Sequence, residues 1–564
     1  RGRQRECKRR RGRDPRGRLN NVLERPVLCS ALLVVATLSA LAQPNRPAVS
    51  SRADFQISGT LVDSNTGQPI ARARVAIAPV TERDNFSTMF TQEDGRFAFP
   101  RLMPGKYTLS AQARGYLLQS FNQHDQFSSS IVVGPDLDSA NLLFRLPPEG
   151  AISGVVADEA GEPVRDAQVM LYSTGLSGGS EATRRRAATM TNDEGAYHFG
   201  HLAPGRYLVA VSARPWYAQH SILHASGGTA SGDAPVNPQL DVAYPVTFFP
   251  GVTEAEAAAP LVVGRGEKLS ADLNLQPVAA LHIRVPRDPD AERPTRIALE
   301  KRVLDGPPIQ IGEQISNHEN DREIVGLPPG HYTMRTFPLS RDGGNDSTLA
   351  REIDVGNNGE INNAKASSYV PLSAKVEFNA GTSVGQVSLQ LLNKRTREVL
   401  SERVGNGGEL AFKQGVLPGS YEVSLASSSG FYLRSLSATG ATVTGRTIDI
   451  RPGNTVTLAI GATIGEGQIT GTALRLDKPV AGAMIVLVPA DPAHNQVLYR
   501  RDQSDSDGTF TLPAVVPGRY TVLAIGSGWD LEWTKPSVLS SYMTAGVVVE
   551  VQANGKYDVK VPVQ

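Results

Sequence analysis

Histidines are the first residues in this chain that could bind a metal or carry acid–base chemistry, and there are nine of them in 564 residues. A zinc peptidase site needs a His-x-x-Glu pair and a distant third ligand, but no histidine here has Glu three positions later. His198 and His201 are the nearest alternative. An odd separation places side chains on opposite faces of a strand, so we expect two surface histidines and no metal site.

Two other patterns resemble sites for catalysis or ion binding. Residues 175–179 read GLSGG and match G-x-S-x-G, a motif that presents a nucleophilic serine only between a strand and a helix. Residues 505–508 (DSDG) and 63–67 (DSNTG) look like the start of calcium loops, but neither continues to the spaced glutamate. We therefore expect a flexible Ser/Gly-rich loop, two hairpin turns, no cofactor and no enzymatic activity.

Aromatic side chains are the remaining candidates for ligand contact. The candidates are Trp216, Tyr217, Trp529, Trp533 and Tyr542, which all follow a strand that begins at a Pro-Gly-x-Tyr turn. Flat aromatic faces stack on sugar rings. The alternative is that these residues cap the open end of a β-sandwich.

The segments that must position these side chains are marked by a repeat. Residues 94–107 (DGRFAFPRLMPGKY), 194–207 (EGAYHFGHLAPGRY) and 507–520 (DGTFTLPAVVPGRY) are three copies. Asp-Gly predicts a type I′ hairpin turn and Pro-Gly a second turn, while alternation places Phe97 and Phe99 on one strand face. The turn residues are Gly95, Pro104, Gly105, Tyr107, Gly195, Pro204, Gly205, Tyr207, Gly508, Pro517, Gly518 and Tyr520.

Two weaker copies end at Tyr332 and Tyr421, and Asn320 takes the place of the first glycine in one of them. The five Pro-Gly turns are separated by 100, 125, 89 and 99 residues, which predicts five domains. We assign a leader and signal peptide to 1–42 and β-sandwich domains to 53–147, 150–276, 277–370, 371–465 and 466–564. The long spacing reflects a loop inserted near residues 216–250, where Tyr244, Phe248 and Phe249 could form an edge strand or a binding lip.

Each strong copy opens with a similar pair of strands, at Ile57, Ile152 and Ile469. Gly59, Gly154 and Gly471 lie within the first strand of each pair, where glycine marks a bulge or a close backbone approach. Short strands with regular turns and no long amphipathic helix predict an all-β, antiparallel architecture.

The order I-[ST]-G, then P-V/I-x-x-A, then D/E-G-x-F/Y, then L-x-P-G-x-Y resembles the carboxypeptidase regulatory-like domain. The resemblance is close for domains one, two and five and weaker for three and four. It implies a tandem array of about five seven-stranded Greek-key β-sandwich domains of the transthyretin-like type, related to carbohydrate-binding-like folds. The motif residues of that family are structural, so the resemblance implies no active site.

The N-terminus carries eleven of the 57 basic residues before an apolar run from Val27 to Ala42. The run is short for a membrane span and ends in a small-x-small pattern, which predicts a signal peptide cut after Ala42. A basic nucleic-acid-binding arm and a start site placed too far upstream are the alternatives for residues 1–26.

Removing residues 1–42 takes away 11 of 57 basic and 3 of 56 acidic side chains and leaves 46 against 53. A negative balance argues against a nucleic-acid partner. Both cysteines, Cys7 and Cys29, leave with the leader, so disulfides and thiol chemistry are not expected. No other segment is long enough to span a membrane.

We therefore expect an exported, non-catalytic protein in the periplasm, at the cell surface or outside the cell. A polysaccharide is the favoured ligand and an envelope protein the next partner, with oligomeric state left open. A structural spacer without ligand specificity is the rival hypothesis.

Overall fold

The computed structural model describes residues 55–137, 139–220, 237–285, 295–316, 322–338, 349–360, 369–379 and 386–564. The predicted leader and signal peptide, residues 221–236 of the predicted insert, and Asn320 lie outside this part of the chain. Residues from Arg52 to Gln564 form one compact unit, so the five domain boundaries stay a prediction. Each group of strands is called a sheet pair below.

The all-β prediction is confirmed, because strands supply nearly all of the regular structure. The one α-helix of the described residues, α1, covers only Pro536–Leu539. No helix in the described residues has both the length and the apolar character needed to cross a membrane.

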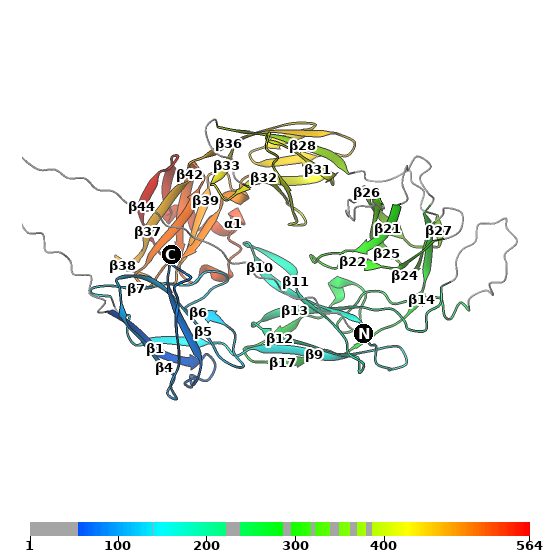
Figure 1. Cartoon of the computed structure of the whole chain (residues 1–564), viewed down its shortest axis with the longest axis horizontal. Coiled ribbons are helices and arrows are strands. Elements are labelled where there is room, and N and C mark those ends of the chain that lie inside the picture. The colour runs from blue at the N-terminus through cyan, green and yellow to red at the C-terminus, as the bar shows by residue number, and fades with distance from the viewer. Residues whose placement is uncertain are drawn as a thin grey trace, which may run out of the picture. The chain divides into compact units, whose positions relative to one another are not determined.

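The first sheet pair is drawn in blue and cyan in Figure 1. Its sheets have the orders β4-β1-β8 and β3-β2-β5-β6, and β7 also pairs with β5. The strands are β1 (Phe55–Asp63), β2 (Arg74–Pro79), β3 (Ser87–Phe90), β4 (Arg96–Leu102), β5 (Gly105–Gln112), β6 (Gln119–Ser120), β7 (Ile131–Val133) and β8 (Leu142–Leu146).

The second sheet pair has the orders β12-β9-β17 and β11-β10-β13-β15, with β18 beside β9 and β16 beside β13. Its strands are β9 (Gly150–Ala157), β10 (Gln168–Ser177), β11 (Ser180–Met190), β12 (Ala196–Leu202), β13 (Gly205–Ser212), β15 (Thr247–Phe248), β16 (Leu261–Val263), β17 (Lys268–Ser270) and β18 (Leu273–Asn274). A short ladder of β14 (Val242–Ala243) with β19 (Val278–Ala279) leads to the third pair.

The third sheet pair has the orders β23-β24-β20-β27 and β22-β21-β25-β26. Its strands are β20 (Leu281–Val285), β21 (Thr295–Lys301), β22 (Ile309–Ile311), β23 (Glu313–Ser316), β24 (Arg322–Leu327), β25 (Gly330–Pro338), β26 (Leu349–Val355) and β27 (Gly359–Glu360).

The fourth sheet pair has the orders β31-β28-β36-β33 and β30-β29-β32-β35-β34. Its strands are β28 (Val370–Phe378), β29 (Val387–Asn393), β30 (Val399–Arg403), β31 (Glu409–Val416), β32 (Gly419–Ser427), β33 (Phe431–Thr439), β34 (Ala441–Thr444), β35 (Thr447–Ile450) and β36 (Val456–Ile464).

The fifth sheet pair has the orders β38-β37-β41, with β44 beside β37, and β40-β39-β42-β43. Its strands are β37 (Gly467–Arg475), β38 (Lys478–Pro479), β39 (Met484–Pro489), β40 (Arg500–Gln503), β41 (Thr509–Val515), β42 (Gly518–Ile525), β43 (Val547–Val551) and β44 (Lys556–Pro562).

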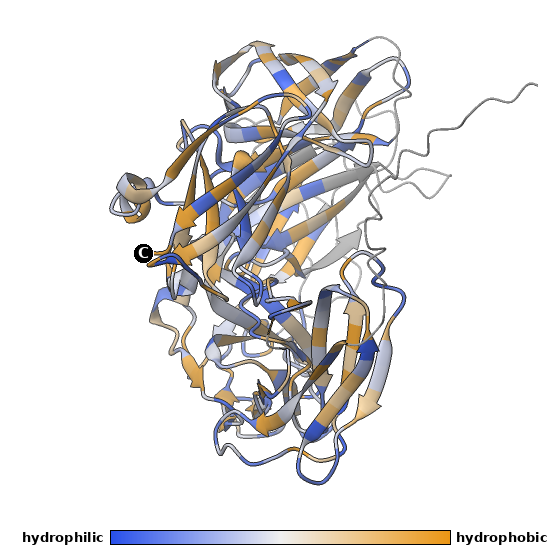
Figure 2. Ribbon diagram, turned by 90° about the vertical axis from the view of Figure 1, so that its left-hand side faces the viewer, coloured by the Kyte–Doolittle hydropathy of each residue, from blue (hydrophilic) through white to orange (hydrophobic). Residues whose placement is uncertain are grey.

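Each sheet pair encloses a hydrophobic core to which both of its sheets contribute, and this makes it a sandwich. In the first pair, Ile57 of β1 and Phe97 of β4 meet Val75 of β2 and Leu109 of β5. Apolar and polar residues alternate along the strands, as the colours in Figure 2 show. The prediction that Phe97 and Phe99 share a buried face is confirmed, since both are buried between exposed neighbours.

Every sheet pair contains a parallel ladder, and the second contains two because β18 also lies parallel to β9, which corrects the expectation of purely antiparallel sheets. The first strand of the pair lies parallel to a strand at its end, as in β1 with β8, β9 with β17, β20 with β27, β28 with β36 and β37 with β44. The chain between these strands makes the whole sandwich, so it is long enough for a parallel crossover.

The repeated Asp-Gly and Pro-Gly turns also differ from the predicted hairpins. Strand β4 pairs with β1 whereas β5 pairs with β2, so each turn carries the chain from one sheet to the other. In the Asp-Gly turn only Gly95 has positive φ, 74°, whereas Asp94 does not, so the predicted type I′ geometry is wrong. An added Cβ at Gly95 would lie 2.6 Å from the Leu61 carbonyl oxygen. Glycine is required there because the turn packs directly on β1.

The glycines inside the first strands mark a close backbone approach, as predicted. A Cβ at Gly59 would lie 2.2 Å from the Leu142 carbonyl oxygen, and one at Gly471 would lie 2.3 Å from that of Val559. Both neighbours belong to the parallel partner strand. The prediction of a close backbone approach is therefore confirmed. The sequence did not indicate which strand lies next to these glycines.

The insert of the second pair ends in an edge strand. Strand β15 pairs with β13, and both Tyr244 and Phe248 are 5 % exposed. Of the two alternatives for this aromatic group, the structure favours the edge strand over the binding lip.

Candidate functional site

A large cleft lies between residues of the first and second sheet pairs. Its volume is about 1480 Å³. The first pair contributes the ends of β2 and β5, the loop after β5 and strand β8, and the second contributes β11, the turn after β12 and the loop after β16. Six arginines line it: Arg72, Arg74, Arg114, Arg145, Arg186 and Arg265.

Strand alternation explains why the guanidinium group of Arg145 faces solvent. Arg145 lies on β8 between Phe144 and Leu146, which are both buried in the first core. Successive side chains of a strand point to opposite faces, so burial of the two neighbours turns Arg145 outward. All six arginines are exposed.

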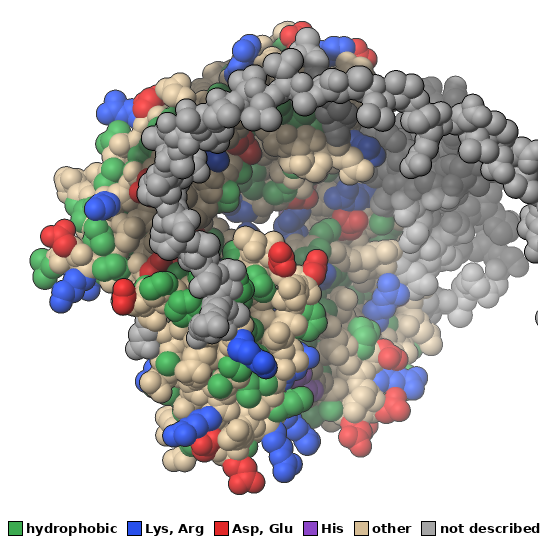
Figure 3. Space-filling view, turned by 60° about the vertical axis from the view of Figure 1, so that its left-hand side comes forward, with side chains coloured by type: hydrophobic (Ala, Val, Ile, Leu, Met, Phe, Trp, Pro, Cys, Tyr) green, Lys and Arg blue, Asp and Glu red, His purple; other side chains and the backbone are tan. Residues whose placement is uncertain are grey.

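The cleft is strongly cationic because its arginines have no carboxylate partners. Among the described residues none of the six forms an ion pair. The two acidic residues that line the cleft are engaged elsewhere: Asp125 pairs with Arg501 at 3.2 Å, and Glu149 pairs with His201. By contrast, basic and acidic side chains are interspersed on the face of the molecule that Figure 3 shows.

Exposed apolar side chains accompany these charges. Phe90 is 68 % exposed, Leu118 63 % and Leu143 45 %, and all three line the cleft. An exposed phenyl ring beside guanidinium groups provides a flat apolar face next to strong hydrogen-bond donors.

Tyr116, an aromatic residue after β5, also lines the cleft and is held by Asp63. Its hydroxyl donates to Asp63 Oδ2 at 2.9 Å. Burial, followed by this hydrogen bond and the nearby charge, raises the pKa of Tyr116. Burial also acts to raise the pKa of Asp63, but hydrogen bonds from the backbone N–H groups of Thr66 and Asn65 outweigh it and leave that pKa lowered. The residue 63–67 turn is thus an Asx turn whose carboxylate is already occupied.

Of the five predicted ligand-contact aromatics, Trp216 is the most open. It follows β13, is 87 % exposed and packs edge-on against Tyr217 at 5.9 Å between ring centroids. The Tyr217 hydroxyl donates to Glu159, which also accepts from Tyr244 at 2.7 Å. Burial and the Glu159 carboxylate raise the pKa of Tyr217 to about 12. Ligand contact through this pair stays a prediction.

The other three aromatics belong to a small apolar cluster of the fifth sheet pair. Trp533 is 9 % exposed and packs against Tyr499 at 5.5 Å, while Trp529 and Tyr542 are half-buried beside them. Trp529 Nε1 donates to the Gly482 carbonyl at 3.2 Å, and its ring stacks on His124 of the first pair at 4.7 Å. Little ring surface remains open for a sugar, so the capping alternative describes their surroundings better.

The GLSGG segment is the tip of the β10–β11 hairpin and is not the loop that was predicted. Its Gly179 carbonyl accepts from Thr534 Oγ1 at 2.7 Å, and a Cβ at Gly179 would meet the Trp533 ring at 2.5 Å. No helix follows Ser177, so the context of a catalytic serine is lacking. The glycines allow this tip to dock on the segment that carries Trp533.

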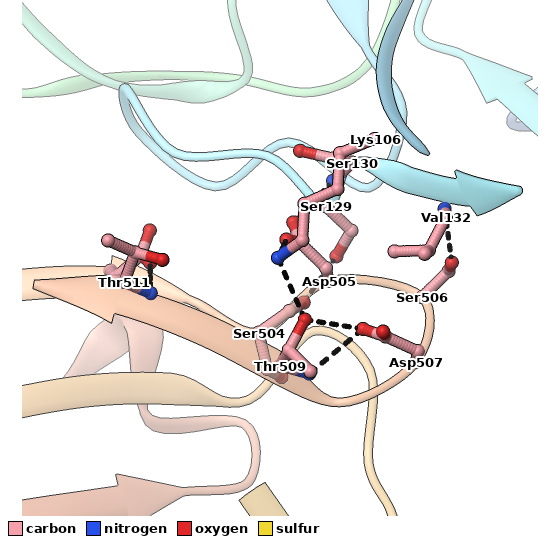
Figure 4. A network of polar contacts seen from close by, with 11 residues as sticks. Lys106, Ser129, Ser130, Val132, Ser504, Asp505, Ser506, Asp507, Thr509 and Thr511 are labelled. Atoms are coloured by element: carbon pink, nitrogen blue, oxygen red, sulfur yellow. Dashed lines mark hydrogen bonds and ion pairs between the residues drawn. The ribbon is translucent and has the colours of Figure 1, made fainter. Parts of the chain in front are cut away.

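The DSDG turn lies at a contact between the first and fifth sheet pairs, and Figure 4 shows its network. Asp505 accepts from Lys106 Nζ at 2.6 Å and from the Ser130 backbone N–H at 2.8 Å. The Ser506 hydroxyl accepts from the Val132 N–H at 2.8 Å. These donors occupy the groups that a calcium ion would need. The interpretation as a turn is therefore favoured over a calcium loop, although all three partner residues belong to a different sheet pair.

His198 and His201 are both exposed, as predicted, but for a different reason. A register shift between Phe199 and Leu202, with positive φ at His201, interrupts the alternation that was expected to separate the rings.

A second histidine cluster was missed. It consists of His220, Asp241 and His282. Asp241 lies 21 positions after His220 in the sequence, and His282 lies 41 positions after Asp241. No local spacing signal could have found them.

The sequence matches the profile of the carboxypeptidase regulatory-like domain twice, over residues 56–137 and 151–235. No curated protein matches it. Solved structures that are similar include the Bacillus anthracis TIE protein, at 12 % identity over 90 % of this chain and 74 % of that chain with a TM-score of 0.16. Another is GBS52, the minor pilin of Streptococcus agalactiae, at 12 % identity over 42 % and 100 % with a TM-score of 0.20.

A third is BcpA, the major pilin subunit of Bacillus cereus, at 11 % identity over 73 % of this chain and 99 % of that chain with a TM-score of 0.14. TM-scores of this size carry no argument about function. The profile matches cover the first sheet pair up to Leu137 and most of the described part of the second, and they confirm the resemblance there. This chain is therefore similar to the carboxypeptidase regulatory-like domain over residues 56–137 and 151–235.

Proposed function

We propose that this chain is an exported, non-catalytic binding protein whose ligand is an acidic polysaccharide, held in the cleft between the first and second sheet pairs. The observation that carries the proposal is the set of six exposed arginines without ion pairs. The protein would act in the periplasm, at the cell surface or outside the cell.

Guanidinium chemistry supports an anionic ligand. Arginine offers planar, paired donors that fit a carboxylate or sulfate in a bidentate manner, and such charge-assisted hydrogen bonds are about twice as strong as neutral ones. Arg145, Arg186 and Arg265 come from two sheet pairs, so a ligand that reaches all three spans both. A polymer with one charge per sugar could engage several of them together, which strengthens binding without new contacts.

The apolar part of the cleft supports a sugar over a protein partner. Phe90 can stack on the C–H face of a sugar ring. Only Phe90, Leu118 and Leu143 are large, exposed and apolar among the lining residues. Arginine is enriched at protein–protein interfaces, but the core of such an interface is also rich in aromatic and other apolar contact, and the cleft offers only these three large apolar side chains. The acidic balance of the chain after residue 42 argues against nucleic acid.

Affinity gel electrophoresis of the full chain tests the proposal. Gels containing a carboxylated polymer, polygalacturonate, are compared with gels containing neutral dextran. We expect retardation by polygalacturonate that the Arg145→Gln/Arg265→Gln variant loses. The matched control is Arg434→Gln/Arg451→Gln, which removes the same charge from exposed positions outside the cleft and should be retarded like the parent.

Equal retardation of both double variants would mean that net charge alone explains the binding, and it would overturn the assignment of the site to the cleft. Retardation by dextran that Trp216→Ala abolishes would move the site to the exposed pair formed by Trp216 and Tyr217. No retardation in either gel would favour the rival hypothesis of a structural spacer.

A further inference from the structure

We propose that His220, Asp241 and His282 form a binding site for one divalent transition-metal ion, with zinc as the reference ion. Asp241 Oδ1 lies 2.9 Å from His220 Nδ1, and its Oδ2 lies 2.8 Å from His282 Nε2. The three ligand atoms all lie within 4.8 Å of one another. This inference concerns a different part of the chain from the cleft and does not depend on the proposed function.

The three ligands have the right chemistry for such an ion. Imidazole nitrogen suits zinc, copper, nickel and iron, and a carboxylate adds charge to balance the cation. Tetrahedral zinc binds nitrogen and oxygen at about 2.0–2.2 Å, which sets neighbouring ligand atoms about 3.4 Å apart. Small rotations of the two rings and the carboxylate would convert the observed hydrogen-bonded group into this arrangement.

The backbone holds the ligands from both sides of the junction between the second and third sheet pairs. Asp241 directly precedes β14, and its carbonyl accepts from the Ala280 N–H at 2.9 Å. His282 lies on β20, and its N–H donates to Asn358 Oδ1 at 2.8 Å. The Gln219 N–H donates to the Leu240 carbonyl at 2.8 Å, which brings His220 beside Asp241. A preformed frame reduces the entropy that metal binding must overcome.

A buried carboxylate stands behind one of the histidines. The His282 side chain is 2 % exposed and that of Glu323 is 3 % exposed, and Glu323 Oε1 lies 3.6 Å from His282 Nδ1. Among the described residues, His282 Nδ1 has no hydrogen-bond partner. Metal-binding histidines commonly direct their second nitrogen at a carboxylate, which orients the ring. Metal binding at Nε2 would leave the proton on Nδ1. After a small shift, this N–H could donate a hydrogen bond to the Glu323 carboxylate.

A cavity borders the site at His220. His220 lines a cavity of about 360 Å³ together with Asp166, Arg214 and Gly326. Gly326 has φ of +71°, and a Cβ there would lie 2.5 Å from His220 Nε2, so glycine leaves space for the ring. Three protein ligands leave at least one coordination position for water or a small ligand from this cavity. The ion would also join the end of the second sheet pair to β20 of the third.

The test uses the full chain after treatment with EDTA and desalting. Isothermal titration with Zn²⁺ should show one strong site per chain, and Co²⁺ should develop visible d–d absorption of a four- or five-coordinate site with nitrogen ligands. Loss of a partner behind a ligand weakens metal binding by about 10- to 100-fold, so Asp241→Asn and His282→Gln should lose at least about tenfold. His198→Gln is the matched control, since it removes an exposed histidine outside the cluster.

Because His282 is buried, its variant could lose affinity by unfolding. His220→Gln, at a side chain that is 17 % exposed, avoids this difficulty and should show the same loss with an unchanged circular dichroism spectrum. A stoichiometry other than one, or equal affinity of His220→Gln, Asp241→Asn and the control, would overturn the proposal and leave a buried hydrogen-bonded group that binds no metal.

Discussion

Replacing Tyr520 by Phe should destabilise the fifth sheet pair by removing one buried hydrogen bond. The Tyr520 hydroxyl donates to the Val516 carbonyl at 2.7 Å, and Tyr520 is 2 % exposed while Val516 is 7 % exposed. The same bond recurs in every copy of the Pro-Gly-x-Tyr turn, from tyrosine to the carbonyl of the residue before proline. It therefore ties the turn that carries the chain between sheets.

The expected loss is about 1–3 kcal/mol, the cost of leaving a buried carbonyl without its donor. Phenylalanine retains the ring, so no cavity contributes. Burial raises the pKa of Tyr520 from its ordinary value of 10 to about 12. The folded protein therefore holds this proton more tightly than the unfolded chain does. At about 1.36 kcal/mol per pH unit, stability of about 3 kcal/mol is present below pH 10 and is lost as pH rises toward 12.

Urea denaturation followed by tryptophan fluorescence is a suitable assay, because Trp529 and Trp533 both pack in the fifth sheet pair. The difference between parent and variant should be largest at pH 7 to 9 and should shrink as pH approaches 12. Tyr542→Phe is the control, since no hydrogen bond from the Tyr542 hydroxyl is found among the described residues. A Tyr520→Phe loss equal to that of the control, or a difference that grows with pH, would refute the reasoning.

Gly471→Ala should destabilise the protein by about 1–3 kcal/mol or more, because its Cβ would lie 2.3 Å from the Val559 carbonyl oxygen. Gly175→Ala is the control, since no atom lies within 4 Å of a Cβ placed there. Similar melting temperatures for the two variants would count against the close approach. Asp502→Asn should stabilise the protein at pH 7. Burial raises the pKa of Asp502 to about 6 despite a hydrogen bond from Thr511, so the charged form costs stability above that pH, at most about 3 kcal/mol. The gain should vanish near pH 4, and a gain independent of pH would contradict this origin.

Local turn preferences explain which features of the fold could be predicted from the sequence. Gly95 and Gly471 marked a special turn and a close backbone approach, and the structure confirms both features. The prediction of hairpins at these turns is wrong, because an Asp-Gly pair has the same local preference whether the next strand joins the same sheet or the opposite one. The pairing of β4 with β1 depends on residues about forty positions apart, beyond the reach of turn propensity.

The predicted site residues show the same limit. The position after a strand selected both Trp216, which is 87 % exposed, and Trp533, which is 9 % exposed. The difference arises because Gly179 and Arg501 cover Trp533 from other parts of the fold, with the guanidinium 4.5 Å from the ring centroid. Periodicity predicts the strand face on which a side chain lies. It does not predict which distant segment packs over that side chain.

The sequence by itself determined the all-β class, the positions of the repeated turns and the buried face shared by Phe97 and Phe99, since these follow from the preferences of neighbouring residues. Tertiary structure alone decided that first and last strands pair in parallel, that six arginines from two sheet pairs share one cleft, and that His220, Asp241 and His282 meet. Those juxtapositions join residues far apart in the chain. They are set by the packing of whole sheets, which no local pattern records.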